Sequence, residues 1–196
     1  MEKIILFLPL VSAFISGFFG KIIGYKLSQL ITCLFVCLST VLSILVFYEV
    51  LYNDYTNNII IAKWINSGEL NVNWSIYIDP ISSVMLVVVT LISSLVHIYS
   101  IGYMAEDPHK PRFMAYLSLF TFAMLTLVTS DNFLQLFFGW EGVGLCSYFL
   151  IGFWYKKNSA NNAAIKAFIV NRVGDFGFAL GIFLIFYLCG TVNYSE

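Results

Sequence analysis

Six long apolar stretches, separated by short polar segments, run through the whole chain. They cover approximately Ile4–Phe19, Leu27–Tyr52, Ile81–Ile101, Phe113–Thr129, Phe133–Trp154 and Asn162–Leu188. A helix needs about 20 residues to cross the roughly 30 Å hydrocarbon core of a bilayer, and backbone groups in lipid must be hydrogen-bonded within their own segment. The pattern therefore predicts an all-α fold, a polytopic bundle of about six transmembrane helices.

Two segments need separate interpretation. The first apolar run follows Met1-Glu-Lys3 and resembles the core of a signal peptide. No small-x-small cleavage site follows it and a second run comes at once, so we interpret it as the first transmembrane helix. The one sizeable loop is Asn53–Asp79, where Trp64 and Trp74 predict a position along the membrane interface.

Composition agrees with a membrane protein. Hydrophobic residues make up 60% of the 196 residues and charged residues 11%, whereas soluble domains average about 25% charged residues. A chain of this length cannot bury so much apolar surface within itself.

The basic residues are divided unevenly between the two sides of the predicted bundle. The loops after the first, third and fifth runs hold Lys21, Lys26, Lys110, Arg112, Lys156 and Lys157. The opposite side has Lys3 and Lys63. The positive-inside rule places the richer side in the cytoplasm or the mitochondrial matrix. The N-terminus is then expected on the periplasmic or intermembrane side of a bacterial or mitochondrial inner membrane.

One carboxylate interrupts the fifth run near its middle. A charge at the depth of Glu141 costs roughly 2.5–3.5 kcal/mol on insertion scales unless it is paired, hydrated or protonated. The sixth run carries Arg172 and Asp175 at comparable depth. At 1.5 Å per residue, Glu141 and Asp175 both lie roughly 20 Å from the inner ends of their helices. Ionisable groups at one level on neighbouring spans predict a path for protons or ions.

The charges also have a purely structural interpretation, as a fixed ion pair that orders the bundle. Arg172 and Asp175 are three residues apart, a spacing that lets them pair on one helix face. A Glu141 that gains and loses a proton as a positive partner moves would be part of a proton path, whereas a fixed pair would only order the bundle. Lys166 is a weaker candidate, because it lies closer to the inner surface and can reach it without any function.

The remaining polar and small residues are interpreted conservatively. Gly177-x-x-x-Gly181 predicts close helix packing. Cys33 and Cys37 are one helical turn apart, but no C-x-x-C or second pair completes a metal site, so the cysteines are interpreted as apolar helix residues. His97, near the end of the third run, is interpreted as an interfacial polar group and not as a haem ligand.

Several cofactor and partner classes lack their motifs. The chain has no G-x-G-x-x-G sequence, no P-loop and no set of cysteines for an iron–sulfur cluster. No basic and aromatic pattern suggests nucleic acid. We therefore expect no cofactor-binding site and no metal site in this chain.

Four stretches in order resemble a known family. They are Ser93–Met104, Pro108–Phe113, Asp131–Leu145 with its Gly-Trp-Glu-Gly, and Ala163–Gly177 with its Asn-Arg-Val-Gly-Asp. Together they resemble the N-terminal part of the largest antiporter-like membrane subunit of respiratory complex I. The resemblance runs over essentially the whole chain and is densest from about Trp74 onward.

The resemblance implies a division and a set of functional residues. Residues 1–60 would hold two N-terminal helices, 61–112 the outer loop, third helix and inner loop, and 113–196 the start of the proton-translocating antiporter-like domain. Glu141 would be the fifth-helix carboxylate of a buried charge pair, and Arg172 and Asp175 its charged neighbours. The partner lysine of the family lies on a seventh helix, beyond the six predicted here.

The resemblance also implies partners and a mechanism. Electrons would pass from NADH to quinone, through FMN and iron–sulfur clusters, in other subunits. This chain would couple that transfer to proton movement, in contact with adjacent antiporter-like subunits and the lipid bilayer.

Two alternatives remain open. The first is the homologous subunit of a multisubunit cation/proton antiporter, which shares the glutamate. The second is a structural membrane anchor, in which Glu141 and Asp175 only lock helix packing.

Overall fold

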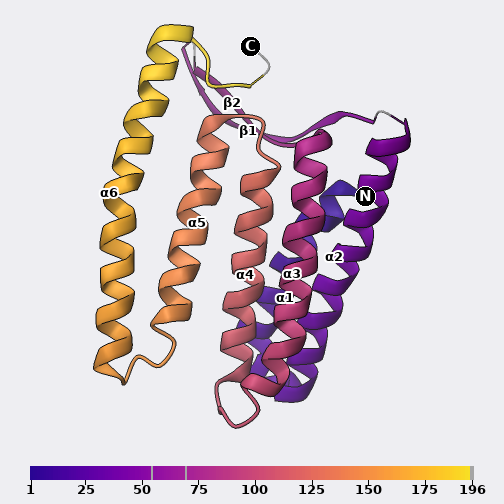
Figure 1. Cartoon of the computed structure of the whole chain (residues 1–196), viewed down its shortest axis with the longest axis vertical. Coiled ribbons are helices and arrows are strands. Elements are labelled where there is room, and N and C mark those ends of the chain that lie inside the picture. The colour runs from indigo at the N-terminus through magenta and orange to yellow at the C-terminus, as the bar shows by residue number, and fades with distance from the viewer. Residues whose placement is uncertain (54, 69, 195–196) are drawn as a thin grey trace.

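Six long helices stand side by side in the structure, a computed structural model that describes residues 1–53, 55–68 and 70–194 (Figure 1). The helices are α1 (Glu2–Ile23), α2 (Tyr25–Asn53), α3 (Pro80–Tyr103), α4 (Lys110–Val128), α5 (Phe133–Ile151) and α6 (Asn158–Cys189). All six are long and apolar enough to cross a membrane. The expected bundle of six spanning helices is confirmed, and every helix overlaps its predicted run.

Local hydrogen bonds define where two of these helices begin. Asp79 accepts a hydrogen bond from the Ser82 backbone N–H at 2.6 Å, and the Ser82 hydroxyl accepts one from the Asp79 backbone N–H at 2.7 Å. Pro80 occupies the first turn of α3, where its missing N–H has no partner to lose. At the start of α5, Asn132 accepts from the Gln135 N–H at 2.7 Å. Both caps satisfy donors that a helix start leaves free.

Helices α1 to α4 pack through small polar side chains. Ser43 and Thr90 donate to carbonyls four residues earlier in their own helices, at 2.8 and 2.7 Å. Thr40 adds a contact between helices, donating to the Thr90 carbonyl at 2.9 Å. Lipid offers no hydrophobic gain for helix association, so small residues and hydrogen bonds drive packing of this kind. Many large apolar side chains of these helices are exposed, among them Phe18, Leu34 and Tyr99.

The stretch expected to be a loop folds as a β-hairpin. Strands β1 (Asn57–Ser67) and β2 (Leu70–Ile78) pair antiparallel, from Asn57 opposite Ile78 to Ser67 opposite Leu70, with two register shifts. The loop interpretation overlooked a signal in β2, where apolar residues occupy every second position. Strict alternation is the pattern of a half-buried strand.

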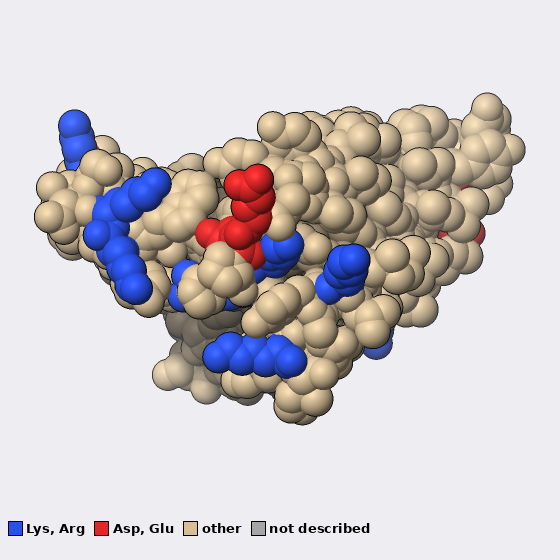
Figure 2. Space-filling view, turned by 90° about the horizontal axis from the view of Figure 1, so that it is seen from below, with Lys and Arg blue, Asp and Glu red and all other residues tan. Residues whose placement is uncertain are grey.

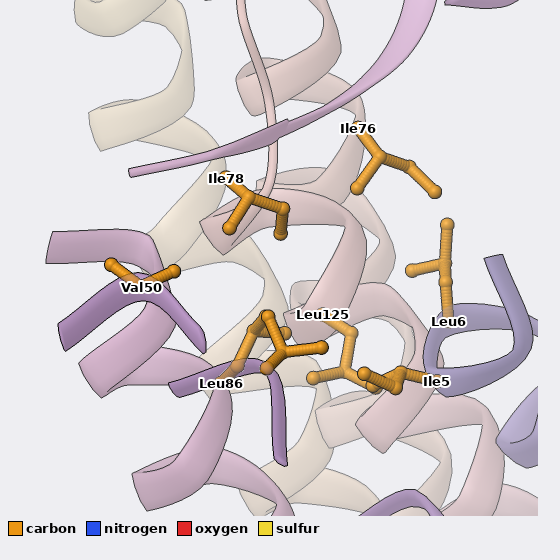
Figure 3. Packing of buried hydrophobic residues seen from close by; sticks show 8 residues of the cluster. Ile5, Leu6, Val50, Ile76, Ile78, Leu86 and Leu125 are labelled. Atoms are coloured by element: carbon orange, nitrogen blue, oxygen red, sulfur yellow. The ribbon is translucent and has the colours of Figure 1, made fainter. Parts of the chain in front are cut away.

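The hairpin closes one end of the bundle. Figure 3 shows Ile76 and Ile78 of β2 pointing toward Ile5 and Leu6 of α1 and toward Leu125 of α4, and all five are buried. The hairpin also extends across the helix ends toward α6 (Figure 1). There Val72 of β2 packs with Ile182 of α6 and with Val192.

The two loop tryptophans join this packing. The rings of Trp64 and Trp74 lie 5.3 Å apart, and both contact the Phe138 ring of α5, at 5.8 and 4.9 Å between ring centres. Gln135, one turn earlier in α5, exchanges two hydrogen bonds with the Ser75 backbone, at 3.0 and 2.7 Å. The hairpin therefore fixes the start of α5, the helix that carries Glu141.

Candidate functional site

The mid-helix carboxylate is paired across the α5–α6 interface. Glu141 lies at the middle of α5, and its Oε1 accepts a hydrogen bond from Arg172 Nη1 of α6 in an ion pair. The Arg172 guanidinium also lies over the Phe168 ring, 4.9 Å from its centre. Pairing lowers the cost of two charges at this depth. The chain thus supplies Glu141 with a positive partner from its own sixth helix, besides the seventh-helix lysine that the family resemblance implies.

Asp175 has a different partner from the one predicted. Spacing along α6 suggested a pair between Arg172 and Asp175. Instead, Trp140 Nε1 of α5 donates to Asp175 Oδ1 at 2.7 Å, while Arg172 reaches across to Glu141. Asp175 is buried. The i, i+3 prediction was wrong because it considered one helix alone, and the neighbouring helix offers each charged group a better-placed partner.

These two contacts place the charged groups at one level. They start from adjacent residues of α5, Trp140 and Glu141, and end one helical turn apart on α6, at Asp175 and Arg172. The structure thus brings three of the four predicted site residues together. Trp140 is a fourth member that sequence reasoning missed, although it stands next to Glu141 in the motif.

A cleft with several polar groups in its wall lies beside this group. It has a volume of about 260 Å³ and lies between α5 and α6. Trp140, Ser147, Asn171 and Asp175 provide its polar lining. Glu141 and Arg172 are not among its lining residues, so the ion pair and the cleft occupy different sides of the same interface. Asp175 is the charged group that faces the cleft, and a cleft of this size and polarity can hold water.

The glycines around the site differ in their surroundings. Gly177 and Gly181 have nothing within 4 Å of where a Cβ would stand, so they meet no other helix of the described chain. A close approach is found at Gly139, where a Cβ would lie 2.7 Å from the backbone of Leu127 on α4. The helix packing predicted for Gly177-x-x-x-Gly181 therefore stays a prediction.

Lys166 stands apart from the other site residues. It is exposed on α6, nearer to the end that carries the loop before that helix. It contributes neither to the Glu141–Arg172 pair nor to the lining of the cleft. The structure does not bring it to the site.

His97 differs from its sequence interpretation. It is fully buried between α3 and α4 and is not an interfacial group. Its Nδ1 lies 2.7 Å from the Ser93 carbonyl, and its Nε2 lies 3.0 Å from the Ser118 hydroxyl of α4. The Ser93 hydroxyl in turn lies 2.5 Å from that of Thr121. Sequence position suggested the interface, but the Ser and Thr residues at helical spacing around it mark a polar helix contact.

Cysteines and acidic residues form no obvious metal cluster in the described part of the chain. No group of three or more His, Cys, Asp or Glu side chains gathers within residues 1–53, 55–68 and 70–194. Cys33, Cys37, Cys146 and Cys189 are free thiols.

Comparison with known proteins adds the family. Residues 64–114 match the family described as NADH-ubiquinone oxidoreductase (complex I), chain 5 N-terminus, and residues 130–196 match NADH:quinone oxidoreductase/Mrp antiporter, TM. NADH-ubiquinone oxidoreductase chain 5 of Chondrus crispus is 54% identical over 195 residues, 100% of this chain and 29% of the relative. NADH-quinone oxidoreductase subunit L of Rickettsia conorii is 55% identical over 192 residues, 98% of this chain and 29% of the relative.

Two solved structures share the fold. The archaeal membrane-bound sulfane sulfur reductase superposes with a TM-score of 0.83 at 20% identity, over 98% of this chain and 38% of the other. The Mrp complex of Dietzia sp. gives 0.82 at 21% identity, over 100% of this chain and 20% of the other. The chain thus spans less than a third of the length of the curated relatives named above. The two family matches together cover more than half of this chain. It belongs to the family of NADH-ubiquinone oxidoreductase chain 5 and NADH-quinone oxidoreductase subunit L, the antiporter-like membrane subunits of complex I.

Proposed function

We propose that the chain is the N-terminal part of a proton-translocating subunit in the membrane arm of NADH:quinone oxidoreductase. The observation that carries the proposal is the mid-helix group of Glu141, Arg172 and Asp175, held by contacts across α5 and α6. Intramembrane ionisable residues are costly and are retained chiefly for ion or proton pathways. Electron transfer from NADH to quinone takes place in other subunits, and this chain contributes the proton step.

Arg172 is the movable group in this proposal. It pairs with Glu141 across the interface, and it also lies three residues from Asp175 on its own helix, a distance at which helix neighbours interact. In the structure Arg172 pairs with Glu141 and Trp140 donates to Asp175, so each carboxylate has a donor from the neighbouring helix. When Arg172 turns toward Asp175, Glu141 is left unpaired and takes up a proton, since an unpaired charge at this depth is unfavourable.

Trp140 acts as a positioning residue. Its indole N–H holds Asp175 at the wall of the cleft. A water in that cleft can bring a proton to Asp175 from one side of the group while Glu141 exchanges on the other. Lys166, closer to the end of α6, has a minor role at most, guiding protons toward the cleft by its charge.

The basic end of the bundle faces the cytoplasm or matrix. Figure 2 looks onto this end and shows Lys and Arg side chains spread over it, with acidic side chains near their centre. The positive-inside rule then places the hairpin and the N-terminus on the periplasmic or intermembrane side. The membrane is the bacterial or the mitochondrial inner membrane.

Other helices cover α5 and α6 in the assembled protein. Only Ala164, Asp175 and Ile182 of α6 are buried, although its middle carries two charges. We assign this cover to the remainder of the full-length subunit and to neighbouring antiporter-like subunits. That cover supplies the conformational signal that moves Arg172.

A cation/proton antiporter subunit is the second candidate, because one of the matching families includes the Mrp antiporters and the fold is shared. The high-identity relatives bear oxidoreductase names, which favours complex I. Rotenone-sensitive NADH oxidation that co-purifies with the protein would support the first function. Sodium-dependent proton exchange without NADH oxidation would support the second.

The direct test introduces Glu141→Gln into the full-length subunit within its complex. In sealed vesicles, NADH:quinone turnover and the resulting proton gradient are measured together. We expect normal assembly and a proton gradient reduced about tenfold or more, alone or with turnover, because a neutral amide cannot carry a proton. Glu106→Gln, in the exposed loop before α4, is the matched control and should change neither rate. Normal turnover and a normal gradient in the Glu141 variant would refute the proposal.

A further inference from the structure

A second cavity lies at the basic end of the bundle, far from the mid-helix charges. It has a volume of about 220 Å³ and lies where α4, α5 and α6 meet. Arg112 stands in the first turn of α4, Tyr155 follows the end of α5, and Asn161 stands in the first turn of α6. All three therefore lie at the level where helices leave the bilayer. Tyr116 and Tyr148 complete the polar lining, so the cavity has one cation and several neutral donors.

The Arg112 guanidinium is fixed by its neighbours, and some of its N–H donors have no partner within the described chain. Its guanidinium lies over the rings of Phe153 and Tyr155, 4.7 and 5.5 Å from their centres, and Nη2 donates to the Phe153 carbonyl at 3.1 Å. A guanidinium carries five N–H donors. Among the described residues Arg112 forms no ion pair, and its buried Nε has no hydrogen-bond partner. A fixed, incompletely satisfied guanidinium beside a cavity is suited to an oxyanion such as a phosphate, two of whose oxygens can accept parallel N–H bonds.

Asp107, the acidic residue whose pKa the charge of Arg112 helps to lower, already has hydrogen-bond donors of its own. Asp107 accepts hydrogen bonds from Trp154 Nε1 at 2.9 Å and from the His109 backbone N–H at 2.7 Å. Burial raises the pKa of Asp107, but these bonds and the charges of His109 and Arg112 outweigh it, so its pKa lies below the ordinary value. Asp107 is therefore ionised and satisfied by other donors, and it does not use up the donors of Arg112.

Two basic residues follow Tyr155, which lines the cavity, directly in the chain. Lys156 and Lys157 lie in the segment between α5 and α6 and are exposed. Lys157 Nζ also lies 5.0 Å from the centre of the Trp154 ring, which keeps that charge close to the end of α5. These residues belong to the basic end seen in Figure 2. Together with Arg112 they place three positive charges on this part of the basic end, a concentration that favours an anion over a zwitterion.

An apolar groove lies on the other side of Tyr116 from this cavity. It has a volume of about 220 Å³ and lies between α1 and α4, with Phe14, Phe18, Ala115 and Leu119 in its walls. Tyr116 lines both the groove and the polar cavity. At 1.5 Å per residue, Leu119 lies roughly 14 Å below the start of α4, which is the depth of acyl chains.

We propose that this composite site binds an anionic glycerophospholipid of the inner leaflet. Its phosphate lies against Arg112, and one acyl chain lies in the groove between α1 and α4. Three observations converge on this ligand: a guanidinium with spare donors at headgroup depth, a concentration of positive charge on this part of the basic end, and an apolar groove at acyl depth joined to the cavity by Tyr116. The inference rests on the membrane fold and is independent of proton translocation by Glu141.

The test uses the full-length subunit in its assembled complex, reconstituted in nanodiscs. The probe is a phosphatidylglycerol with a photoactivatable diazirine in one acyl chain, and mass spectrometry locates the crosslinks. We expect crosslinks to the walls of the groove, at residues 13–18 and 115–119. Unlabelled phosphatidylglycerol should suppress them, whereas phosphatidylcholine with the same acyl chains and inorganic phosphate should not.

Variants sharpen the test. Arg112→Gln should reduce crosslinking about tenfold, as expected for the loss of one charge-assisted hydrogen-bonding group. Arg112→Lys should keep part of it, because the charge remains without the fork geometry. The exposed pair Lys156→Gln and Lys157→Gln should lower the preference for phosphatidylglycerol even if Arg112→Gln does not assemble. Lys63→Gln, on the hairpin at the other end, is the control and should change nothing.

Three results would overturn the proposal. Equal crosslinking and competition by phosphatidylcholine would show an unspecific lipid surface. Suppression by inorganic phosphate would show a site for the free anion. Absence of lipid crosslinks to the groove walls in the assembled complex would show that protein covers the site.

Discussion

Helices α1 to α4 and helices α5 to α6 use polar residues in opposite ways. In the first group the buried polar side chains are neutral Ser, Thr, Gln and His, and most bond to carbonyls or hydroxyls within the group, as Thr40 does with Thr90. In the second group the mid-helix contacts involve residues of charged type, Glu141 with Arg172 and Asp175 with the Trp140 indole, beside a cleft. The comparison teaches that neutral polar contacts in this chain hold the bundle together, whereas charged contacts are available for transport.

Substitutions that break packing should therefore lower stability most and proton transport least. Substitutions among the charged residues should lower proton transport most and stability least. Three changes, in order of falling effect on stability, test this.

Gly139→Ala should have the largest effect on stability. Its new Cβ would lie 2.7 Å from the Leu127 backbone, and the two helices must separate to admit it. We expect a loss of about 1–3 kcal/mol, the usual cost of overpacking, seen as a lower unfolding temperature of the purified complex. Gly144→Ala is the matched control because nothing lies within 4 Å of its Cβ position. Equal stability of the two variants would show that α4 and α5 do not approach closely at Gly139.

His97→Leu should have an intermediate effect. The substitution replaces the imidazole with an apolar side chain of similar size. It leaves the Ser118 hydroxyl without the His97 Nε2 that lies 3.0 Å away. Hydrogen bonds between membrane helices are worth about 0.6 kcal/mol on average and up to about 1.7 kcal/mol, so we expect a stability loss in that range. Proton transport per assembled complex should stay unchanged. Loss of transport at normal stability would mean that the neutral contact of α3 and α4 also serves function.

Trp140→Phe should have the smallest effect on stability and a larger one on transport. Phenylalanine keeps an aromatic ring beside Phe178 but removes the N–H that donates to Asp175 at 2.7 Å. Because Asp175 lines the cleft, a water there can replace the lost donor, so we expect stability within about 1 kcal/mol of the parent. The proton gradient per NADH oxidised should fall several-fold. Trp154→Phe, which removes an indole N–H from Asp107 in the loop, is the control. A normal gradient in the Trp140 variant would exclude a positioning role for this residue.

The sequence predicted much of the fold because length and hydropathy decide where a membrane helix can form. All six spans and the mid-helix position of Glu141 followed from these alone, and the basic end followed from the distribution of Lys and Arg. The hairpin was missed although Leu70 to Ile78 alternate, because a loop between spans carries no requirement for a strand. The partners of Arg172 and Asp175 depend on how α5 and α6 are rotated about their axes. Spacing along one helix does not determine that rotation, so the pairs became visible only in the structure.

The most direct test of the account is to neutralise both members of the cross-helix pair at once. Replacing a buried ion pair by neutral groups is often harmless to stability, whereas removing one partner leaves an uncompensated charge. We predict that the full-length subunit with Glu141→Gln and Arg172→Gln assembles to parental levels but builds no proton gradient when NADH is supplied to sealed vesicles. A double variant that assembles and pumps like its parent would contradict the account, because the pair would then only order the bundle.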